Sequence, residues 1–76
     1  MTKSLTEEDI KYLISRLLVE ASDAAKEGKA NPKDSFLAGR QVAYYEMLDI
    51  LQSELSIADA DLKEFGLDIN LEKEFA

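Results

Sequence analysis

The fold of this chain is decided by the stretch NPKDSFLAGRQVAYYEMLDILQSEL, which occupies residues 31–55. Read as an α-helix that turns ~100° per residue, the stretch places apolar side chains on one straight line. We call this line the seam, and it consists of Leu37, Tyr44, Leu48, Leu51 and Leu55. Steps of seven, four, three and four residues are typical of a helix that packs at a shallow angle against one neighbouring helix.

The same helix carries further apolar side chains beside the seam. We call these the second flank, and they are Phe36, Ala43, Met47, Ile50 and Ile57. With Ala38 and Tyr45 on the other side of the seam, the apolar arc spans ~240°, whereas a helix that faces one core needs only ~100° or slightly more. One neighbouring helix cannot bury so wide an arc, so the second flank predicts a second packing partner.

Six residues are therefore the candidate interface residues of this chain. Tyr45 joins the second flank in this set, because an aromatic ring with a polar tip is favoured at protein interfaces. The full set is Phe36, Ala43, Tyr45, Met47, Ile50 and Ile57.

An amphipathic helix is predicted over residues 6–27, with one apolar face of ordinary width. This face spans ~140° and consists of Ile10, Leu13, Ile14, Leu17, Leu18, Ala21, Ala24 and Ala25. Either Ser4 or Thr6 can cap the start of the helix, since each has an acidic residue three positions later. Gly28 is expected to end the helix in a left-handed conformation.

The second helix is predicted over residues 32–57. Asn31 is expected to be its N-cap, Pro32 its first residue, and Asp34 a favourable charge near the positive helix end. Because the connection at residues 28–34 is short, the two helices should be antiparallel neighbours.

Two residues of the second helix have particular roles in this hairpin. A packing reason is expected for Gly39 inside the helix, where small residues would let the two backbones approach closely near the turn. Arg40 is expected at the edge of the seam, where its guanidinium would pair with Glu20, Asp23 or Glu27 of the first helix.

A short C-terminal element is predicted at residues 60–75, after a break near residues 57–59. Asp59 would cap a short helix that Gly66 stops, and the chain would then be extended or form a final turn capped by Asn70. The segment is too hydrophobic to be disordered, with Leu71 and Phe75 as apolar anchors. It should dock on the hairpin or on a partner.

The predicted fold is all-α: residues 1–76 form a single domain, an antiparallel helical hairpin with a short C-terminal helix or docked tail. Either the tail folds back over the second flank, or two hairpins pair into a dimeric four-helix bundle. We favour the homodimer, because so short a chain buries little surface and has no cysteine for a disulfide. Two-fold pairing is also the commonest association of soluble proteins.

Composition argues against most chemical functions. The chain has no histidine, cysteine or tryptophan, so thiol nucleophiles, histidine bases and His/Cys metal sites are excluded. The acidic run after Asp59 lacks the glycine and ligand spacing of a calcium loop. We predict no enzymatic activity, no catalytic residue, no metal site and no cofactor.

Charge and hydropathy argue against two classes of partner. The net charge of −7 opposes binding to nucleic acid phosphates or to anionic membrane surfaces. No segment reaches the ~20 apolar residues of a membrane span, and we recognise no targeting signal. By default we place this acidic protein in the cytoplasm.

Three classes of function remain from the sequence. The first is a small non-enzymatic interaction protein, an adaptor, regulator or accessory factor, that acts as a homodimer and presents a helical surface to another protein. The second is an acidic inhibitor of the antitoxin or immunity type, whose carboxylates would converge on one face toward a basic partner. The third is a small ligand-binding bundle or enzyme accessory subunit, which needs a pocket of ~300 Å³ or more with convergent polar groups.

Overall fold

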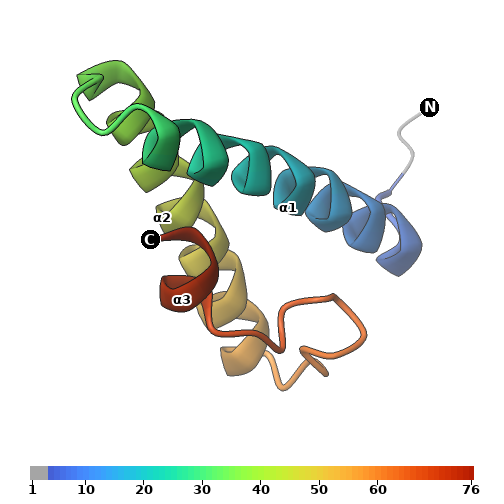
Figure 1. Ribbon diagram of the computed structural model, residues 1–76. Helices are drawn as coiled ribbons and strands as arrows, with labels where there is room; N and C mark the ends of the chain where they lie inside the picture. The colour runs from blue at the N-terminus through green and yellow to red at the C-terminus, as the bar shows by residue number, and fades with distance from the viewer. Residues whose placement is uncertain (1–3) are drawn as a thin grey trace.

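The computed structural model describes residues 4–76, and three helices account for most of them (Figure 1). They are α1 (Glu7–Ala30), α2 (Ser35–Ile57) and α3 (Leu71–Phe75), and no strand occurs among the described residues. The all-α class is confirmed, with two long helices packed against each other and a short helix at the C-terminus. The first three residues of the predicted domain lie outside the described range.

The start of α1 follows the local sequence signal. Thr6 is the N-cap: its Oγ1 accepts a hydrogen bond from the Asp9 N–H at 3.1 Å, and Asp9 Oδ2 accepts one from the Thr6 N–H at 3.0 Å. This reciprocal capping box satisfies two backbone donors at the helix start. Thr6, rather than Ser4, therefore begins the helix.

The end of α1 differs from the prediction. Gly28 is a buried residue inside the helix, and the C-cap is Asn31, whose backbone N–H and side-chain Nδ2 both donate to the Glu27 carbonyl oxygen at 3.1 and 3.0 Å. The role predicted for Gly28 as a left-handed terminator is therefore wrong. Gly28 faces α2, and the Gln41 side chain occupies the space where a Cβ atom would lie. A side chain at position 28 would collide with Gln41, so packing requires glycine here. The helix itself continues through Gly28.

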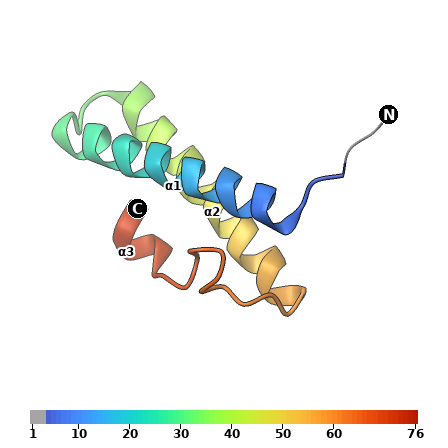
Figure 2. The ribbon, with the colours of Figure 1, turned by 90° about the vertical axis from the view of Figure 1, so that its right-hand side faces the viewer.

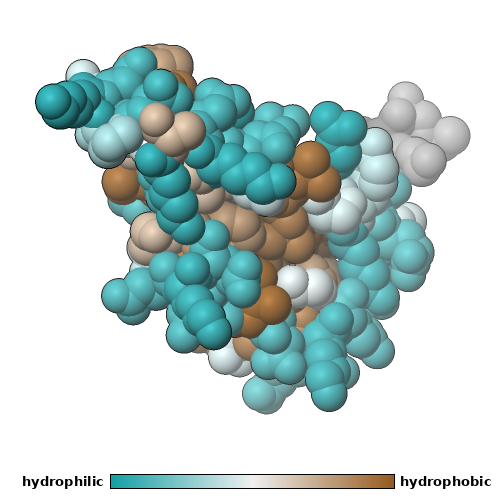
Figure 3. All heavy atoms as spheres, viewed as in Figure 1, coloured by the Kyte–Doolittle hydropathy of each residue, from teal (hydrophilic) through white to brown (hydrophobic). Residues whose placement is uncertain are grey.

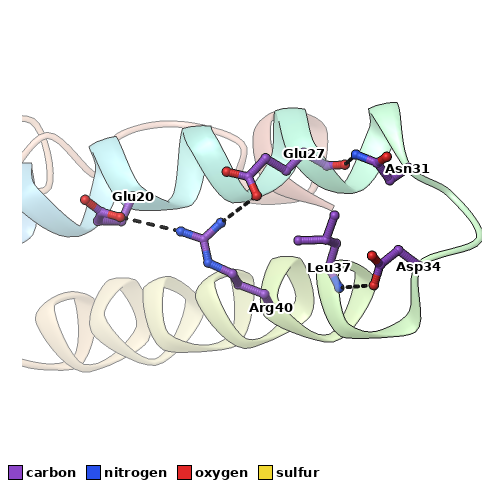
Figure 4. Close-up of polar contacts among 6 residues, drawn as sticks. All are labelled: Glu20, Glu27, Asn31, Asp34, Leu37 and Arg40. Carbon is purple, nitrogen blue, oxygen red and sulfur yellow. Dashed lines mark hydrogen bonds and ion pairs between the residues drawn. The ribbon is translucent and has the colours of Figure 1, made fainter.

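The start of α2 also lies three residues later than predicted. Its N-cap is Asp34, whose Oδ1 accepts hydrogen bonds from the N–H groups of Phe36 and Leu37 at 3.0 and 3.2 Å. Figure 4 shows the second of these bonds. Asn31 is already used at the end of α1, so the predictions that Asn31 caps α2 and that Pro32 begins it are wrong. Pro32 instead lies in the turn between the helices. This turn is closed by a hydrogen bond of 3.0 Å from the Asp34 N–H to the Asn31 carbonyl oxygen.

The break predicted after α2 is confirmed, and Asp59 produces it. Asp59 has a φ of 60°, in the left-handed region, and directly follows the C-cap Ala58. The N–H groups of Ala60 and Asp59 donate back to the carbonyl oxygens of Leu55 and Ser56 at 2.9 and 3.1 Å. This is the Schellman arrangement, which satisfies carbonyl groups at a helix end. Asp59 therefore ends α2 and does not cap a new helix.

The C-terminal segment forms one tight turn and then runs back along α2 (Figures 1 and 2). The turn at residues 62–66 closes at Gly66, which has a φ of 74°. Asn70 caps α3, because its Oδ1 accepts a hydrogen bond from the Lys73 N–H at 3.1 Å. Of the alternatives left open by the sequence, a final turn capped by Asn70 is therefore the one that occurs.

The tail docks on its own hairpin and supplies half of the core. The buried cluster consists of Ile14, Ala21, Ala25, Leu48, Phe65, Leu67, Leu71 and Phe75. Large side chains with less than 2 % exposure are Ile14, Leu48 and Leu67, one each from α1, α2 and the segment before α3. Figure 3 shows apolar atoms in the middle of the face, between α1 and α3, with polar side chains around them. The buried core of the described residues is therefore small.

Candidate interaction surface

The second flank is exposed along the whole length of α2. Phe36, Met47, Ile50 and Ile57 have exposed fractions of 74, 41, 61 and 78 %, and Ala43 is exposed as well. Phe36, Ala43, Ile50 and Ile57 follow each other every seven residues, so they form one line ~32 Å long on the helix. The five residues therefore form one stripe along α2, in which two charged residues, Arg40 and Glu54, lie between the apolar ones.

The seam beside this stripe is used inside the chain. Leu48 is fully buried, and Tyr44, Leu51 and Leu55 are partly buried against the core. Leu37 is likewise partly buried. The seam therefore packs within the chain, as predicted, whereas the second flank is exposed.

The tail does not cover the second flank, although the sequence left this arrangement open. Two glutamines hold the tail on a different side of α2. Gln52 Nε2 donates to the carbonyl oxygens of Leu67 and Ile69 at 2.9 and 3.0 Å, and Gln41 Nε2 donates to that of Phe75 at 3.1 Å. Sequence reasoning missed both glutamines, because nothing in their type or spacing distinguishes them from ordinary surface residues.

Tyr45 lies apart from the other five candidate interface residues. It is partly buried against the core, on the side of α2 that the tail occupies. There it lines a hollow of about 230 Å³ together with Ala38, Gln41, Val42, Phe75 and Ala76. Only Gln41 and the Tyr45 hydroxyl are polar side-chain groups of this lining, so the hollow lacks the convergent polar groups of a specific small-molecule site.

Gly39 is also exposed, and the prediction of close packing against α1 is wrong. A Cβ atom at this position would meet no described atom within 4 Å. On the α1 side, Ala21, Ala24 and Ala25 are buried as expected. Helical spacing places Gly39 beside the second flank and away from α1, which is why it takes no part in the hairpin.

Arg40 lies where the second flank meets α1. Its Nη2 is 3.5 Å from Glu20 Oε2, its Nη1 is 3.7 Å from Glu27 Oε2, and its guanidinium lies 5.4 Å from the centre of the Tyr44 ring (Figure 4). The predicted pairing is confirmed for Glu20 and Glu27, and Asp23 takes no part in it among the described contacts. The Nη1 atom is buried and has no hydrogen-bond partner within residues 4–76. The Arg40 side chain as a whole is 26 % exposed, and only this exposed part can meet a further acceptor.

The exposed apolar surface extends from α2 onto α1. Leu13, predicted as a core residue, is 49 % exposed. It lies seven residues before Glu20 and fourteen before Glu27, so the three side chains share one edge of α1. Since Arg40 joins that edge to α2, Leu13 and the second flank border the same contact between the two helices.

Lys11 forms a second polar contact at the other end of the molecule. Its Nζ lies 3.5 Å from Glu8, 3.8 Å from Glu64 and 5.6 Å from the centre of the Phe65 ring. Desolvation lowers the pKa of Lys11, but the carboxylates of Glu8, Glu7 and Glu64 outweigh it, so the pKa is raised. This contact joins the 62–66 turn to α1 and lies away from the second flank.

The described residues contain neither a metal-binding cluster nor a membrane-spanning helix. Acidic side chains of residues 4–76 do not gather in the groups of three or more that would hold a metal ion. No helix in the same part of the chain combines the length and apolar character needed to cross a membrane.

Comparisons with protein-family models, with curated proteins and with solved structures found no match to this chain.

Proposed function

We propose that this chain is a small, non-enzymatic helical interaction protein, an adaptor, regulator or accessory factor, that works as a homodimer. The observation that carries the proposal is the exposed second flank, which places Phe36, Met47, Ile50 and Ile57 in water along one side of α2. Single exposed apolar residues are normal on a protein surface, but several large ones along one side of a helix mark an interaction site. Burial of one such side chain stabilises a complex by up to ~1.5–3 kcal/mol.

The shape of the chain favours a second copy as the partner. The Cα atoms span 45 × 30 × 15 Å, and two packed helices already occupy ~15 Å, since their axes lie 8–10 Å apart. The shortest dimension therefore leaves room for two layers and no third. A second hairpin placed on the second flank would supply the missing layer and complete a four-helix bundle.

The two alternative functions have less support. The carboxylates of the described residues are distributed over all three helices and the 58–70 connection, so no single element concentrates the acidic charge that an inhibitor would present to a basic protein. The hollow beside Tyr45 is smaller than ~300 Å³ and nearly devoid of polar groups, unlike a ligand-binding bundle.

In the dimer, Tyr12 and Val19 remain exposed on the back of α1, where they would meet another protein.

The test is the oligomeric state of the full chain by sedimentation equilibrium. Wild type should sediment as a dimer, and Ile50→Glu should sediment as a folded monomer, because a charge in the middle of the stripe cannot be buried without a partner. Val19→Glu is the matched control: Val19 is 57 % exposed, close to the 61 % of Ile50, but lies on the back of α1. A monomeric wild type, or equal effects of the two substitutions, would contradict the proposal.

A further inference from the structure

We infer that the second copy pairs with α2 in an antiparallel arrangement, with the two-fold axis at Met47 and Arg40 of each chain facing Glu54 of the other. This inference rests on the proposed homodimer and specifies its orientation and register. It commits the second flank to one occupant, another copy of the same helix.

The spacing of residues around the second flank defines the surface that pairs. Steps of four and three residues alternate along one side of α2 through Phe36, Arg40, Ala43, Met47, Ile50, Glu54 and Ile57. Alternating steps of this kind keep a stripe facing a partner helix over its whole length. The stripe is centred on Met47, with three members before it and three after.

Reversal of the stripe about Met47 produces a complementary surface. Phe36 then faces Ile57 of the second copy, and Ala43 faces Ile50. The small Ala43 thus meets a large side chain, which lets the layers interdigitate. Met47 meets its own copy on the axis, where an unbranched and flexible side chain adapts most easily.

Charge decides between the two possible directions. Arg40 lies seven residues before Met47 and Glu54 lies seven residues after it. In the antiparallel register, Arg40 of each chain therefore faces Glu54 of the other. In a parallel pair with the same stripe, Arg40 would face Arg40 and Glu54 would face Glu54, which is repulsive. The guanidinium already has two carboxylates at 3.5 and 3.7 Å, but 26 % of the Arg40 side chain stays exposed at the edge of the second flank. Glu54 of the second copy is the acceptor that this register brings to Arg40.

Cysteine cross-linking reads the register directly, because the native chain contains no cysteine. A disulfide requires Cα atoms within about 7 Å, and only a residue on the two-fold axis meets its own copy. Under mild oxidation, Met47→Cys should form a covalent dimer. Ala43→Cys and Ile50→Cys should each form at least tenfold less, since their copies would lie ~10 Å apart along the helix. A mixture of these two variants should form the mixed dimer, identified by its mass, and Ser53→Cys on the polar face is the control.

The possible outcomes separate this inference from the proposed function. If wild type is a dimer but Ala43→Cys and Ile50→Cys each cross-link to themselves as fast as Met47→Cys, the helices are parallel and the inference is wrong. If none of the three cross-links while wild type sediments as a dimer, the second flank is not the contact between copies. If wild type is a monomer, the proposed function fails first.

A charge reversal gives an independent measurement of the same contact. Glu54→Lys should raise the dissociation constant of the dimer by about fivefold, because it replaces two attractive contacts by two repulsive ones. Asp49→Lys makes the same change in charge on the exposed polar side of α2 and should have a smaller effect. Equal dissociation constants for the two variants would overturn the pairing of Arg40 with Glu54.

Discussion

Gln41 contacts two elements at once, and Gly28 is the residue that allows this. The Gln41 Nε2 donates to the Phe75 carbonyl oxygen at 3.1 Å, while the same amide lies where a Cβ atom on residue 28 would be. The glycine therefore lets one side chain of α2 reach both α1 and α3. Both residues look unremarkable in the sequence, where glycine near a helix end indicates a cap more often than a contact.

Gly28→Ala should not stabilise the protein, although alanine is the better helix former by ~1 kcal/mol. The new methyl group would displace the Gln41 amide and cost its hydrogen bond to Phe75, which is worth ~1 kcal/mol. In a Gln41→Ala background the same substitution should stabilise by ~1 kcal/mol, because the space is then free. Urea unfolding followed by circular dichroism measures all four variants of this cycle.

Gly39→Ala is the matched control for that cycle. Both glycines lie inside helices, but no described atom would lie within 4 Å of a Cβ at Gly39. Gly39→Ala should therefore stabilise the monomeric Ile50→Glu variant by ~1 kcal/mol through helix propensity alone. If Gly28→Ala stabilises wild type as much as Gly39→Ala stabilises that variant, the contact between Gly28 and Gln41 has no energetic role.

At the scale of elements, α2 has three apolar sides that do three different things. The seam packs within the hairpin, the side with Gln41, Tyr45 and Gln52 holds the tail, and the second flank is open. The wide apolar arc seen in the sequence is the sum of these sides. Helical spacing placed the seam and the second flank, but it could not assign the tail to the Tyr45 side, because the hydrogen bonds that hold the tail involve its backbone carbonyls.

Gln52→Ala should release the tail from α2. The substitution removes both hydrogen bonds to the carbonyl oxygens of Leu67 and Ile69, so the free energy of unfolding should fall by about 1–2 kcal/mol. Backbone amides near α3 should exchange hydrogen faster, while those in the middle of α1 change less. Ser53→Ala, next to it on the exposed side, should change stability by less than about 0.5 kcal/mol. Equal effects of these two substitutions would mean that Gln52 does not hold the tail.

Helix limits show where local sequence was sufficient and where it was not. The start of α1 and the end of α2 were predicted to within one residue, because the Thr6 capping box is local and α2 ends directly before a left-handed residue. The turn between the helices was misplaced by three residues. Asn31 and Asp34 are both good N-caps, and Gly28, which the sequence marked as the helix end, lies inside α1 against Gln41 of α2.

At the scale of the whole molecule, the limiting quantity is the size of the core. Three large side chains of the described residues are fully buried, whereas the large apolar side chains of the second flank are exposed to water. A chain of this length is marginally stable from one such core. Association that buries the second flank would therefore contribute directly to the stability of each hairpin.

The melting temperature of wild type should consequently rise with protein concentration. For a folded dimer that unfolds to single chains, mass action shifts the midpoint upward as concentration increases. Differential scanning calorimetry over a hundredfold range of concentration measures this shift. Ile50→Glu should melt at a lower temperature that does not depend on concentration. A wild-type midpoint that stays constant over the range would speak against association of the folded chain.

The sequence by itself determined the helices, their approximate limits, the antiparallel hairpin and the excess of apolar surface on α2, because capping and helical periodicity depend on residues close together in the chain. Only the tertiary structure decided that the tail covers the side of Tyr45, that Gly28 makes room for Gln41, and which two of the three predicted carboxylates pair with Arg40. These contacts join residues far apart in sequence, so their energies depend on how whole elements are placed. The second flank follows from both: periodicity located it, and the docked tail left it exposed.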